Sequence, residues 1–181
     1  MRKLVAVIAC RNAGSRLYGK PIQNLDIKNN ITILDNIVSC IKTLNFIDDI
    51  CLAVSNEEEN LIYKIFAKKN NIKCIFGDEI DVLGRLIQGG EHTDASDIFR
   101  ITSECPFLYF EEIEQCWNYY IENDLDFSTQ DELIDGIGWS ITKLKALQYS
   151  HKNGDRKHRS EFCHLYIREN MSKFNGIVFT G

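Results

Sequence analysis

Short apolar runs that alternate with amphipathic patterns constrain the fold of this chain more than any other feature. Four strand-like runs recur along the first hundred residues: LVAVIAC at 4–10, ICLAV at 50–54, IKCIF at 72–76 and DIFRIT at 97–102. Strands that alternate with helices indicate a mostly parallel sheet that carries helices on its faces. The expected fold class is therefore α/β, a three-layer sandwich with a mostly parallel, Rossmann-like sheet.

Three segments between and after these runs show the spacing of amphipathic helices. The first is expected at about 32–44, with an apolar stripe of Leu34, Ile37, Val38, Ile41 and Leu44. The second is expected to begin at Asn56, with Glu59 three residues on and a stripe of Leu61, Ile62, Ile65 and Phe66. The third is expected at about 111–122, with a stripe of Ile113, Cys116, Trp117, Tyr120 and Ile121. These stripes indicate core packing and need no functional explanation.

The pattern is weaker after residue 125. We expect a short strand near 126–129, a strand or turn at 136–141, helices near 142–150 and 156–170, and a last strand at 176–179. The chain has 181 residues and no long linker, which suits a single domain over 1–181.

Composition excludes several classes of protein. The net charge of −5 disfavours general nucleic-acid binding, which usually shows as an excess of basic residues. No apolar run approaches the ~20 residues that a membrane span requires, so neither nucleic acid nor a membrane is an expected partner, and a cytoplasmic location is expected. The seven cysteines are an odd number without a CxxC pair, which favours reduced, buried thiols over disulfides or zinc.

A cationic loop follows the first strand. Arg11, Arg16 and Lys20 are separated by small residues, namely Ala13, Gly14, Ser15 and Gly19. Small residues let backbone amides approach a triphosphate closely, and mobile cations neutralise its oxygens. The loop has neither the Walker spacing nor GxGxxG, so P-loop NTPase, kinase and Rossmann dehydrogenase interpretations lose support. A solvated loop whose charges only favour solubility is the alternative.

The order of residues in this loop resembles the signature of sugar-activating cytidylyltransferases, approximately ARxxSxRLxGKPL in the CMP-Kdo and acylneuraminate superfamily. The matching positions are Arg11, Ser15, Arg16, Leu17, Gly19, Lys20 and Pro21. The segments at 47–60, 77–88 and 100–108 also resemble motifs of this family, and DVLGR with RITxxCP is closest to the spore-coat polysaccharide branch.

The resemblance implies a nucleotide-diphospho-sugar transferase sheet and a nucleotidyl transfer reaction, with CMP moving from CTP to a sugar acid or sugar phosphate and pyrophosphate leaving. It implies that Arg11, Arg16 and Lys20 are catalytic and hold the phosphates. It also implies nucleotide-binding roles for Ala9, Cys10, Ala13, Gly14, Ser15, Asp81, Arg85 and Arg100. Asp81 and Arg85 are spaced to form an i,i+4 ion pair. The alternative to a nucleotide-binding role is that this pair is an ordinary surface salt bridge.

The cofactor that the resemblance implies is Mg²⁺. Glu104 stands where the family has a metal-binding Asp, and its longer side chain moves the carboxylate outward. A homodimer is a further expectation drawn from relatives.

Three departures from the family pattern bear on activity. Gly138 and Ser140 replace acidic positions, and Ser160 and Phe162 replace an Arg and a His. The nearby cationic residues that could substitute, or could simply cover a helix, are Arg156, His158, Arg159 and His164. The family also continues into a second acidic metal site, so we expect a chain truncated at its C-terminus. Guanylyl transfer to a sugar 1-phosphate and a non-catalytic nucleotide-binding module are the alternatives in function.

Overall fold

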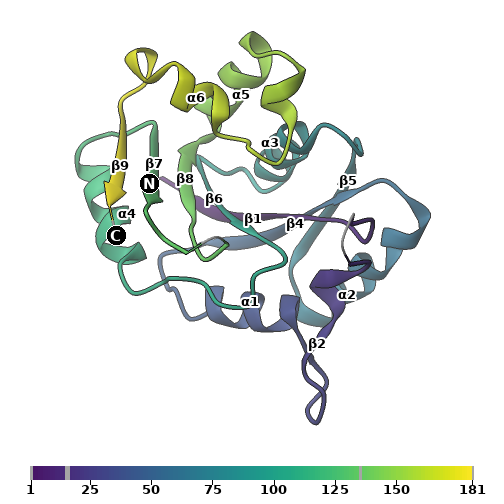
Figure 1. Ribbon diagram of the computed structural model, residues 1–181. Coiled ribbons are helices and arrows are strands. Elements are labelled where there is room, and N and C mark those ends of the chain that lie inside the picture. The colour runs from purple at the N-terminus through teal and green to yellow at the C-terminus, as the bar shows by residue number, and fades with distance from the viewer. Residues whose placement is uncertain (1, 15–16, 135, 181) are drawn as a thin grey trace.

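The computed structural model describes residues 2–14, 17–134 and 136–180. Within these residues, seven strands form one sheet in the order β5-β4-β1-β6-β8-β7-β9 (Figure 1). The strands are β1 Leu4–Cys10, β4 Asp49–Ser55, β5 Lys73–Gly77, β6 Asp97–Thr102, β7 Phe127–Asp131, β8 Ser140–Lys143 and β9 Gly176–Thr180. Of the strands that the structure describes in this sheet, only β8 runs antiparallel to its neighbours, β6 and β7. The predicted mostly parallel α/β sheet is therefore confirmed.

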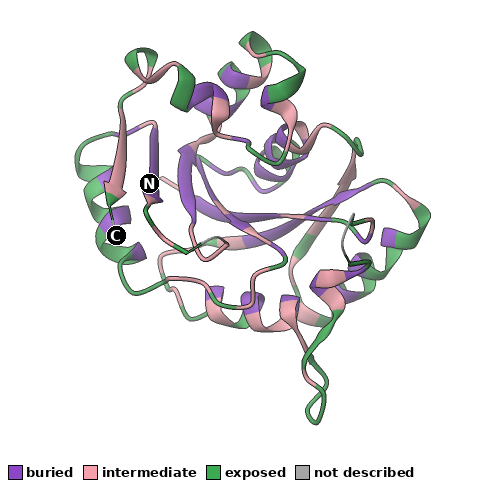
Figure 2. Ribbon diagram, viewed as in Figure 1, coloured by how far each residue is buried: buried purple, intermediate pink, exposed green. Residues whose placement is uncertain are grey.

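Helices cover both faces of the sheet and make the two outer layers of the sandwich. They are α1 Ile33–Ile41, α2 Ile62–Asn70, α3 Val82–His92, α4 Ile113–Glu122, α5 Leu144–Asn153 and α6 Leu165–Glu169. One core cluster joins α1, α2 and α4 to one face, and a second joins α3, α5 and α6 to the other. Strand β1 contributes alternate residues to both clusters, such as Ile8 to the first and Val7 to the second, and Figure 2 shows the central strands as the most deeply buried part.

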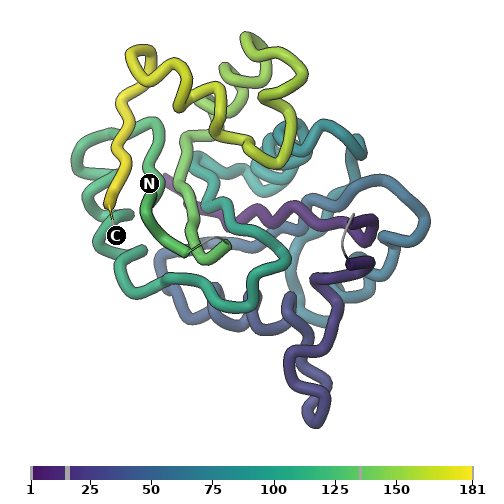
Figure 3. Tube along the Cα trace, in the orientation of Figure 1, coloured from purple at the N-terminus to yellow at the C-terminus, as the bar shows by residue number. Residues whose placement is uncertain are grey.

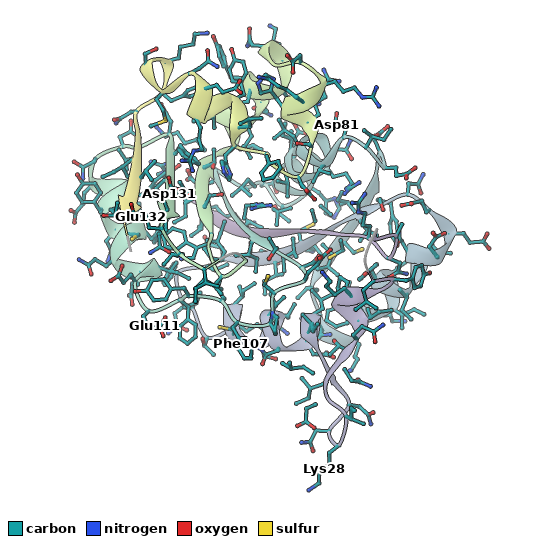
Figure 4. All side chains as sticks on the ribbon, in the orientation of Figure 1. Lys28, Asp81, Phe107, Glu111, Asp131 and Glu132 are labelled. Atoms are coloured by element: carbon teal, nitrogen blue, oxygen red, sulfur yellow. The ribbon has the colours of Figure 1, made fainter. Side chains whose placement is uncertain are left out.

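A small antiparallel hairpin, β2 Asn24–Asp26 and β3 Ile31–Thr32, projects from this body. The trace in Figure 3 shows that it extends well beyond α1, and Figure 4 places Lys28 at its tip. In the described residues no helix is both long and apolar enough to cross a membrane. The seven cysteines all lie within those residues and carry free thiols.

The first helix forms as the sequence predicts. Thr32 caps it, because its hydroxyl accepts a bond of 3.0 Å from the amide of Asp35, whose carboxylate accepts one of 3.1 Å from the amide of Thr32. This reciprocal capping satisfies two donors at the helix start. The predicted stripe faces the core, with Leu34, Ile37, Val38 and Ile41 buried.

The second helix differs from the prediction in its start and in its buried face. A short 3-10 turn, Glu58–Leu61, precedes α2, and Asn56 does not cap the helix. Of the predicted stripe, the exposed members are Leu61, Ile62 and Ile65, while Phe66 is buried. Asn60 is fully buried instead, and it forms one inward row with Tyr63 and Ala67. Hydrogen bonds to Asn60 therefore set the rotation of α2, which an apolar pattern cannot show.

The third helix is confirmed as α4, except that Ile121 is exposed. The helix expected at 156–170 is divided into a 3-10 turn, η3 Arg156–Arg159, and the short α6. The Ser160 hydroxyl donates to the Lys157 carbonyl at 2.9 Å and Ser160 itself is extended, so it ends the first helical piece. The non-helical residues between the two pieces include Ser160, Glu161, Phe162 and His164, which line a cleft.

Candidate active site

A cleft of about 660 Å³ opens at the carboxyl ends of β1 and β6. The strand order reverses between these two neighbours, and in open α/β sheets ligands bind at such a point. We call this space the main cleft. Its lining residues are Ala9, Cys10, Arg11, Glu79, Ile80, Val82, Arg85, Arg100, Ile101, Thr102, Ser103, Glu104, Cys105, Ser160, Glu161, Phe162 and His164.

The loop after β1 is held by a buried polar network around Asn12. The Asn12 amide donates to the side chain of Asn60 at 2.7 Å, and the Asn12 side chain donates to the Glu59 carbonyl at 2.5 Å. Asn60 also donates to Ser55 and Glu57 at 2.9 and 2.8 Å. These bonds tie the root of the cationic loop to the helix layer, so the loop starts from a fixed backbone position.

Two glycines let the loop return on itself. The Gly19 amide donates to the Asn12 carbonyl at 2.8 Å, and Gly19 has a φ of 60°, in the left-handed region. A Cβ on Gly14 would lie 2.7 Å from the Leu17 carbonyl oxygen, which is too close for any larger residue without movement. Glycine at both positions therefore keeps the two ends of the loop together.

The loop brings a lysine against a carboxylate from the loop that follows β6. Lys20 Nζ lies 2.7 Å from Glu104 Oε2, although 84 residues separate them in the chain. Arg11 lines the same cleft, and its carbonyl accepts a hydrogen bond of 3.2 Å from the Tyr63 hydroxyl. The ends of β1 and β6 thus place positive and negative groups side by side at one opening.

Arg85 is a buried cation in the wall of the main cleft. Its side chain is 2% exposed and donates to the carbonyls of Asp78 and Glu79 at 2.6 and 2.9 Å. Burial, and then the neighbouring charge of Arg11, lowers the pKa of Arg85. The pKa of an arginine still lies far above neutral pH, so Arg85 stays charged. It fixes the turn before α3 and adds positive potential beside the cleft.

Asp81 lies apart from this cluster, and the expected ion pair with Arg85 is wrong. The Asp81 carboxylate caps α3 by accepting from the Gly84 amide at 2.7 Å, and it lies 2.5 Å from His151 Nε2 (Figure 4 labels Asp81). The reason is local: N-cap geometry turns the carboxylate back over the helix start. Arg85 instead extends toward backbone carbonyls.

A second, smaller space of about 170 Å³ adjoins the main cleft, and we call it the side pocket. Its lining residues are Arg100, Thr102, Thr129, Gln130, Asp131, Gly136, Gly138, Trp139, His164 and Arg168. Arg100, Thr102 and His164 line both spaces. A Cβ at Gly138 would meet nothing within 4 Å, so glycine, in place of the acidic residue of the family pattern, leaves room in the pocket.

The residues singled out from the sequence are placed as follows. The main cleft brings together Ala9, Cys10, Arg11, Arg85, Arg100 and Glu104. Lys20 joins them through its contact with Glu104. Ala13 and Gly14 lie in the loop but outside the lining, Asp81 lies at the start of α3, and Ser15 and Arg16 lie outside the described residues. Burial raises the pKa of the Cys10 thiol far above its ordinary value, so that thiol is neutral.

Sequence reasoning missed three residues that shape the site. Asn12 and Asn60 anchor the loop, and Gln130 is 7% exposed on the side pocket. An asparagine within an apolar helical stripe was the one available signal for Asn60. No pattern in the sequence distinguishes Gln130 from an ordinary surface glutamine.

Glu104 is the residue that could hold a divalent metal. In the described ranges no group of three or more His, Cys, Asp or Glu side chains is arranged to hold a metal ion. The Glu104 side chain is 43% exposed at the main cleft. Mg²⁺ is commonly bound by one or two carboxylates together with waters and substrate phosphates. The donor set therefore fits an ion that arrives with a triphosphate.

The sequence matches the family described as cytidylyltransferase over residues 5–180. An uncharacterized protein of Methanocaldococcus jannaschii is 27% identical over 173 residues, which cover 95% of this chain and 70% of that protein. A cytidylyltransferase structure from Leptospira borgpetersenii superposes with a TM-score of 0.90 and 20% identity, covering 100% of this chain and 77% of that one. A CMP:2-keto-3-deoxy-manno-octonic acid synthetase complexed with CTP superposes with a TM-score of 0.77 and 12% identity, covering 99% and 90%.

The two structural likenesses show a shared fold, and the family match spans nearly the whole chain. The resemblance found in the cationic loop is thus confirmed at the level of the family, whereas the spore-coat branch stays a prediction. The chain belongs to the cytidylyltransferase family and is a nucleotidyltransferase.

Proposed function

We propose that this protein transfers CMP from CTP to a sugar acid or sugar phosphate and releases pyrophosphate, with Mg²⁺ as cofactor. The observation that carries the proposal is the convergence of Lys20 and Arg11, from the loop after β1, with Glu104, from the end of β6, on one cleft. Cations and a carboxylate at one opening are what a magnesium triphosphate requires.

In this proposal the chain contributes alignment and charge. Lys20 and Arg11 neutralise the β- and γ-phosphates and stabilise the charge that develops on the leaving pyrophosphate. The anchored root at Asn12 holds the loop in place, so that little reorganisation accompanies the reaction. Glu104 would hold Mg²⁺, which supplies Lewis-acid polarisation of the phosphates when bound. Arg16 completes the predicted set of cations and lies outside the described residues.

The choice of CTP is supported by the family and by the neighbouring synthetase that was solved with CTP. We infer further that the product is an activated sugar for bacterial surface polysaccharide or glycan synthesis, made in the cytoplasm where CTP is formed. Guanylyl transfer and nucleotide binding without turnover are the outcomes that would replace this proposal.

The test is pyrophosphate release with each of the four NTPs, Mg²⁺ and a panel of sugar acids and sugar phosphates. We expect release with CTP, and we expect Lys20→Met to lower kcat/KM by about 30- to 1,000-fold, the equivalent of about 2 to 4 kcal/mol. Lys28→Met is the matched control, because Lys28 is exposed at the hairpin tip and should leave turnover unchanged.

Three results would contradict the proposal. Release with GTP in preference to CTP would assign a different base. CTP binding without pyrophosphate release across the whole panel would assign a binding module. Equal turnover of Lys20→Met and Lys28→Met would show that Lys20 does not bind the phosphates.

In the same assay Glu104→Gln should raise the Mg²⁺ concentration needed for half-maximal rate. An unchanged Mg²⁺ requirement would show that Glu104 does not bind the metal.

A further inference from the structure

The side pocket and the main cleft share a wall, and His164 stands in it. Arg100 and Thr102 are the other shared residues. The proposed function, on which this inference rests, puts the phosphates of CTP in the main cleft. The two spaces are adjacent at the three shared residues. A group bound in the side pocket therefore lies next to those phosphates, and we assign the side pocket to the acceptor.

The imidazole of His164 is held in position by ring packing. The residue ends the non-helical segment that separates η3 from α6, and it directly precedes the first turn of α6. Its ring packs on Phe127 with centroids 5.7 Å apart and an interplanar angle of 31°. Nδ1 is buried and has no hydrogen-bond partner among the residues the structure describes. A buried ring nitrogen without a competing partner can hold the single proton of the neutral ring, which leaves the other nitrogen, Nε2, as the acceptor.

Charged groups on three elements face this ring. Arg100 comes from β6, Arg168 from α6 and Asp131 from β7. Arg168 donates to both Asp131 oxygens, at 2.7 and 2.6 Å, and Arg100 donates to the neutral carbonyl of Glu161 at 3.0 Å. The pKa of His164 is lowered to about 4, first by burial and then by Arg100 and Arg168, with Asp131 opposing. At neutral pH the ring is uncharged and able to accept a proton.

The side pocket also offers hydrogen bonds to a hydroxylated ligand. Gln130 is 7% exposed, and neither its amide oxygen nor its amide nitrogen has a partner in the described part of the chain. The side chain can therefore accept from one hydroxyl and donate to another. Sugars present adjacent hydroxyls that suit such a pair, so Gln130 fits the role of a residue that orients the acceptor.

We propose that His164 is the general base of the transfer, taking the proton from an acceptor hydroxyl as that hydroxyl attacks CTP. The hydroxyl oxygen forms a bond to the α-phosphorus, its O–H bond breaks, and the proton moves to a ring nitrogen of His164. The bond from the α-phosphorus to the bridging oxygen breaks, and its electron pair leaves with pyrophosphate. The phosphates of CTP bring negative charge near the ring, which raises the basicity of His164 once the nucleotide is bound.

This assignment also selects the class of acceptor. A sugar phosphate attacks through an oxygen that is already ionised at neutral pH, so it has no proton to transfer to a base. A half-buried, uncharged histidine in the wall between the two spaces therefore indicates an acceptor that attacks through a hydroxyl.

The experiment compares the native protein with His164→Gln, using His92→Gln as the matched control at an exposed position. We expect His164→Gln to lower kcat by about 100- to 10,000-fold while the KM for CTP changes by less than about threefold. We also expect log kcat of the variant to rise with unit slope between about pH 6 and 8, where the native rate is flat, because hydroxide must then remove the proton. Thermal melting of each variant checks that it is folded.

A second measurement needs no turnover. In the native protein the ring pKa of His164, followed by NMR, should rise on addition of CTP, and no rise would overturn the assignment. If native turnover is present and His164→Gln keeps its rate and its flat pH profile, the base is overturned while the proposed function stands. If the native protein neither binds CTP nor releases pyrophosphate with any acceptor, the proposed function fails first and the inference with it.

Discussion

Gln130 illustrates at the scale of one residue how a binding position can cost stability. Its amide is buried in the side pocket, with neither polar atom paired within the described residues. A buried polar group without partners costs about 1 to 3 kcal/mol. A protein shaped only for stability would place an apolar side chain there, and the retained amide is consistent with a ligand that completes its hydrogen bonds.

Replacing Gln130 by Leu should therefore separate stability from function. We expect Gln130→Leu to raise the free energy of unfolding by about 1 kcal/mol, because the unpaired amide is removed from a buried site. We expect the KM for the acceptor to rise at least about tenfold while the KM for CTP is unchanged. Urea unfolding and steady-state kinetics measure the two effects, and an unchanged acceptor KM would show that Gln130 does not contact the acceptor.

At the scale of elements, the turn before β8 closes on the loop after β6 through one glycine. Gly136 has a φ of 93°, and a Cβ there would lie 2.0 Å from the Cys105 sulfur. Both residues line spaces of the site, Gly136 the side pocket and Cys105 the main cleft. The path of this turn thus decides the shape of the side pocket.

Gly136→Ala should disturb this turn. We expect a loss of about 1 to 3 kcal/mol in the free energy of unfolding, since the backbone is strained for any other residue and Cys105 must move. The KM for the acceptor should rise with it. Gly138→Ala is the control for stability, because its Cβ meets open space and should change the free energy of unfolding by less than about 0.5 kcal/mol. Equal stabilities in urea for the two variants would contradict the expectation.

The elements also show what the sequence could predict. Strands β1 and β6 match their expected ranges. For β1 the reason is that a continuous apolar run is typical of a buried parallel strand. The buried face of α2 could not be predicted, because Asn60 is recruited to the interior by partners in other segments. The end of the helical turn at Ser160 could not be predicted either. It depends on a hydrogen bond from the Ser160 hydroxyl to the Lys157 carbonyl, and in the sequence Ser160 looks like an ordinary polar residue of a helix.

The same distinction holds for the site. Arg11, Lys20 and Glu104 could be proposed because the order of residue types in their loops follows a family pattern. His164 was named only as one of several nearby cationic residues, and its packing against Phe127 depends on the position of α6 over β7. The sequence shows which ionisable residues the chain has, and only the tertiary structure shows which of them are shielded from solvent.

At the scale of the whole molecule, two separate core clusters stabilise the central sheet from its two faces. His164 packs on Phe127 of the second cluster, so its ionisation is coupled to global unfolding. The folded pKa is about 4, whereas an unfolded histidine titrates near pH 6.5. Between these values the unfolded form of this histidine binds more protons, so its contribution lowers the free energy of unfolding as the pH drops from about 6.5 to about 4.

This linkage predicts a difference in acid sensitivity. Between pH 7 and pH 5 the native protein should lose about 1 to 2 kcal/mol more of its free energy of unfolding than His164→Gln does. Urea unfolding at both pH values, in the absence of nucleotide, measures it. Identical losses in the two proteins would show that the ring is already protonated in the folded state at pH 5.

The wall of Arg100, Thr102 and His164 has a consequence for how relatives of this protein diverge. A substitution in that wall alters the fit of two substrates at once, so few changes there leave a working catalyst. Gln130, Gly138 and Trp139 face one chamber alone. Substitutions that adapt the fold to new sugars are therefore expected to accumulate at residues that line the side pocket alone, while the three residues of the wall change slowly.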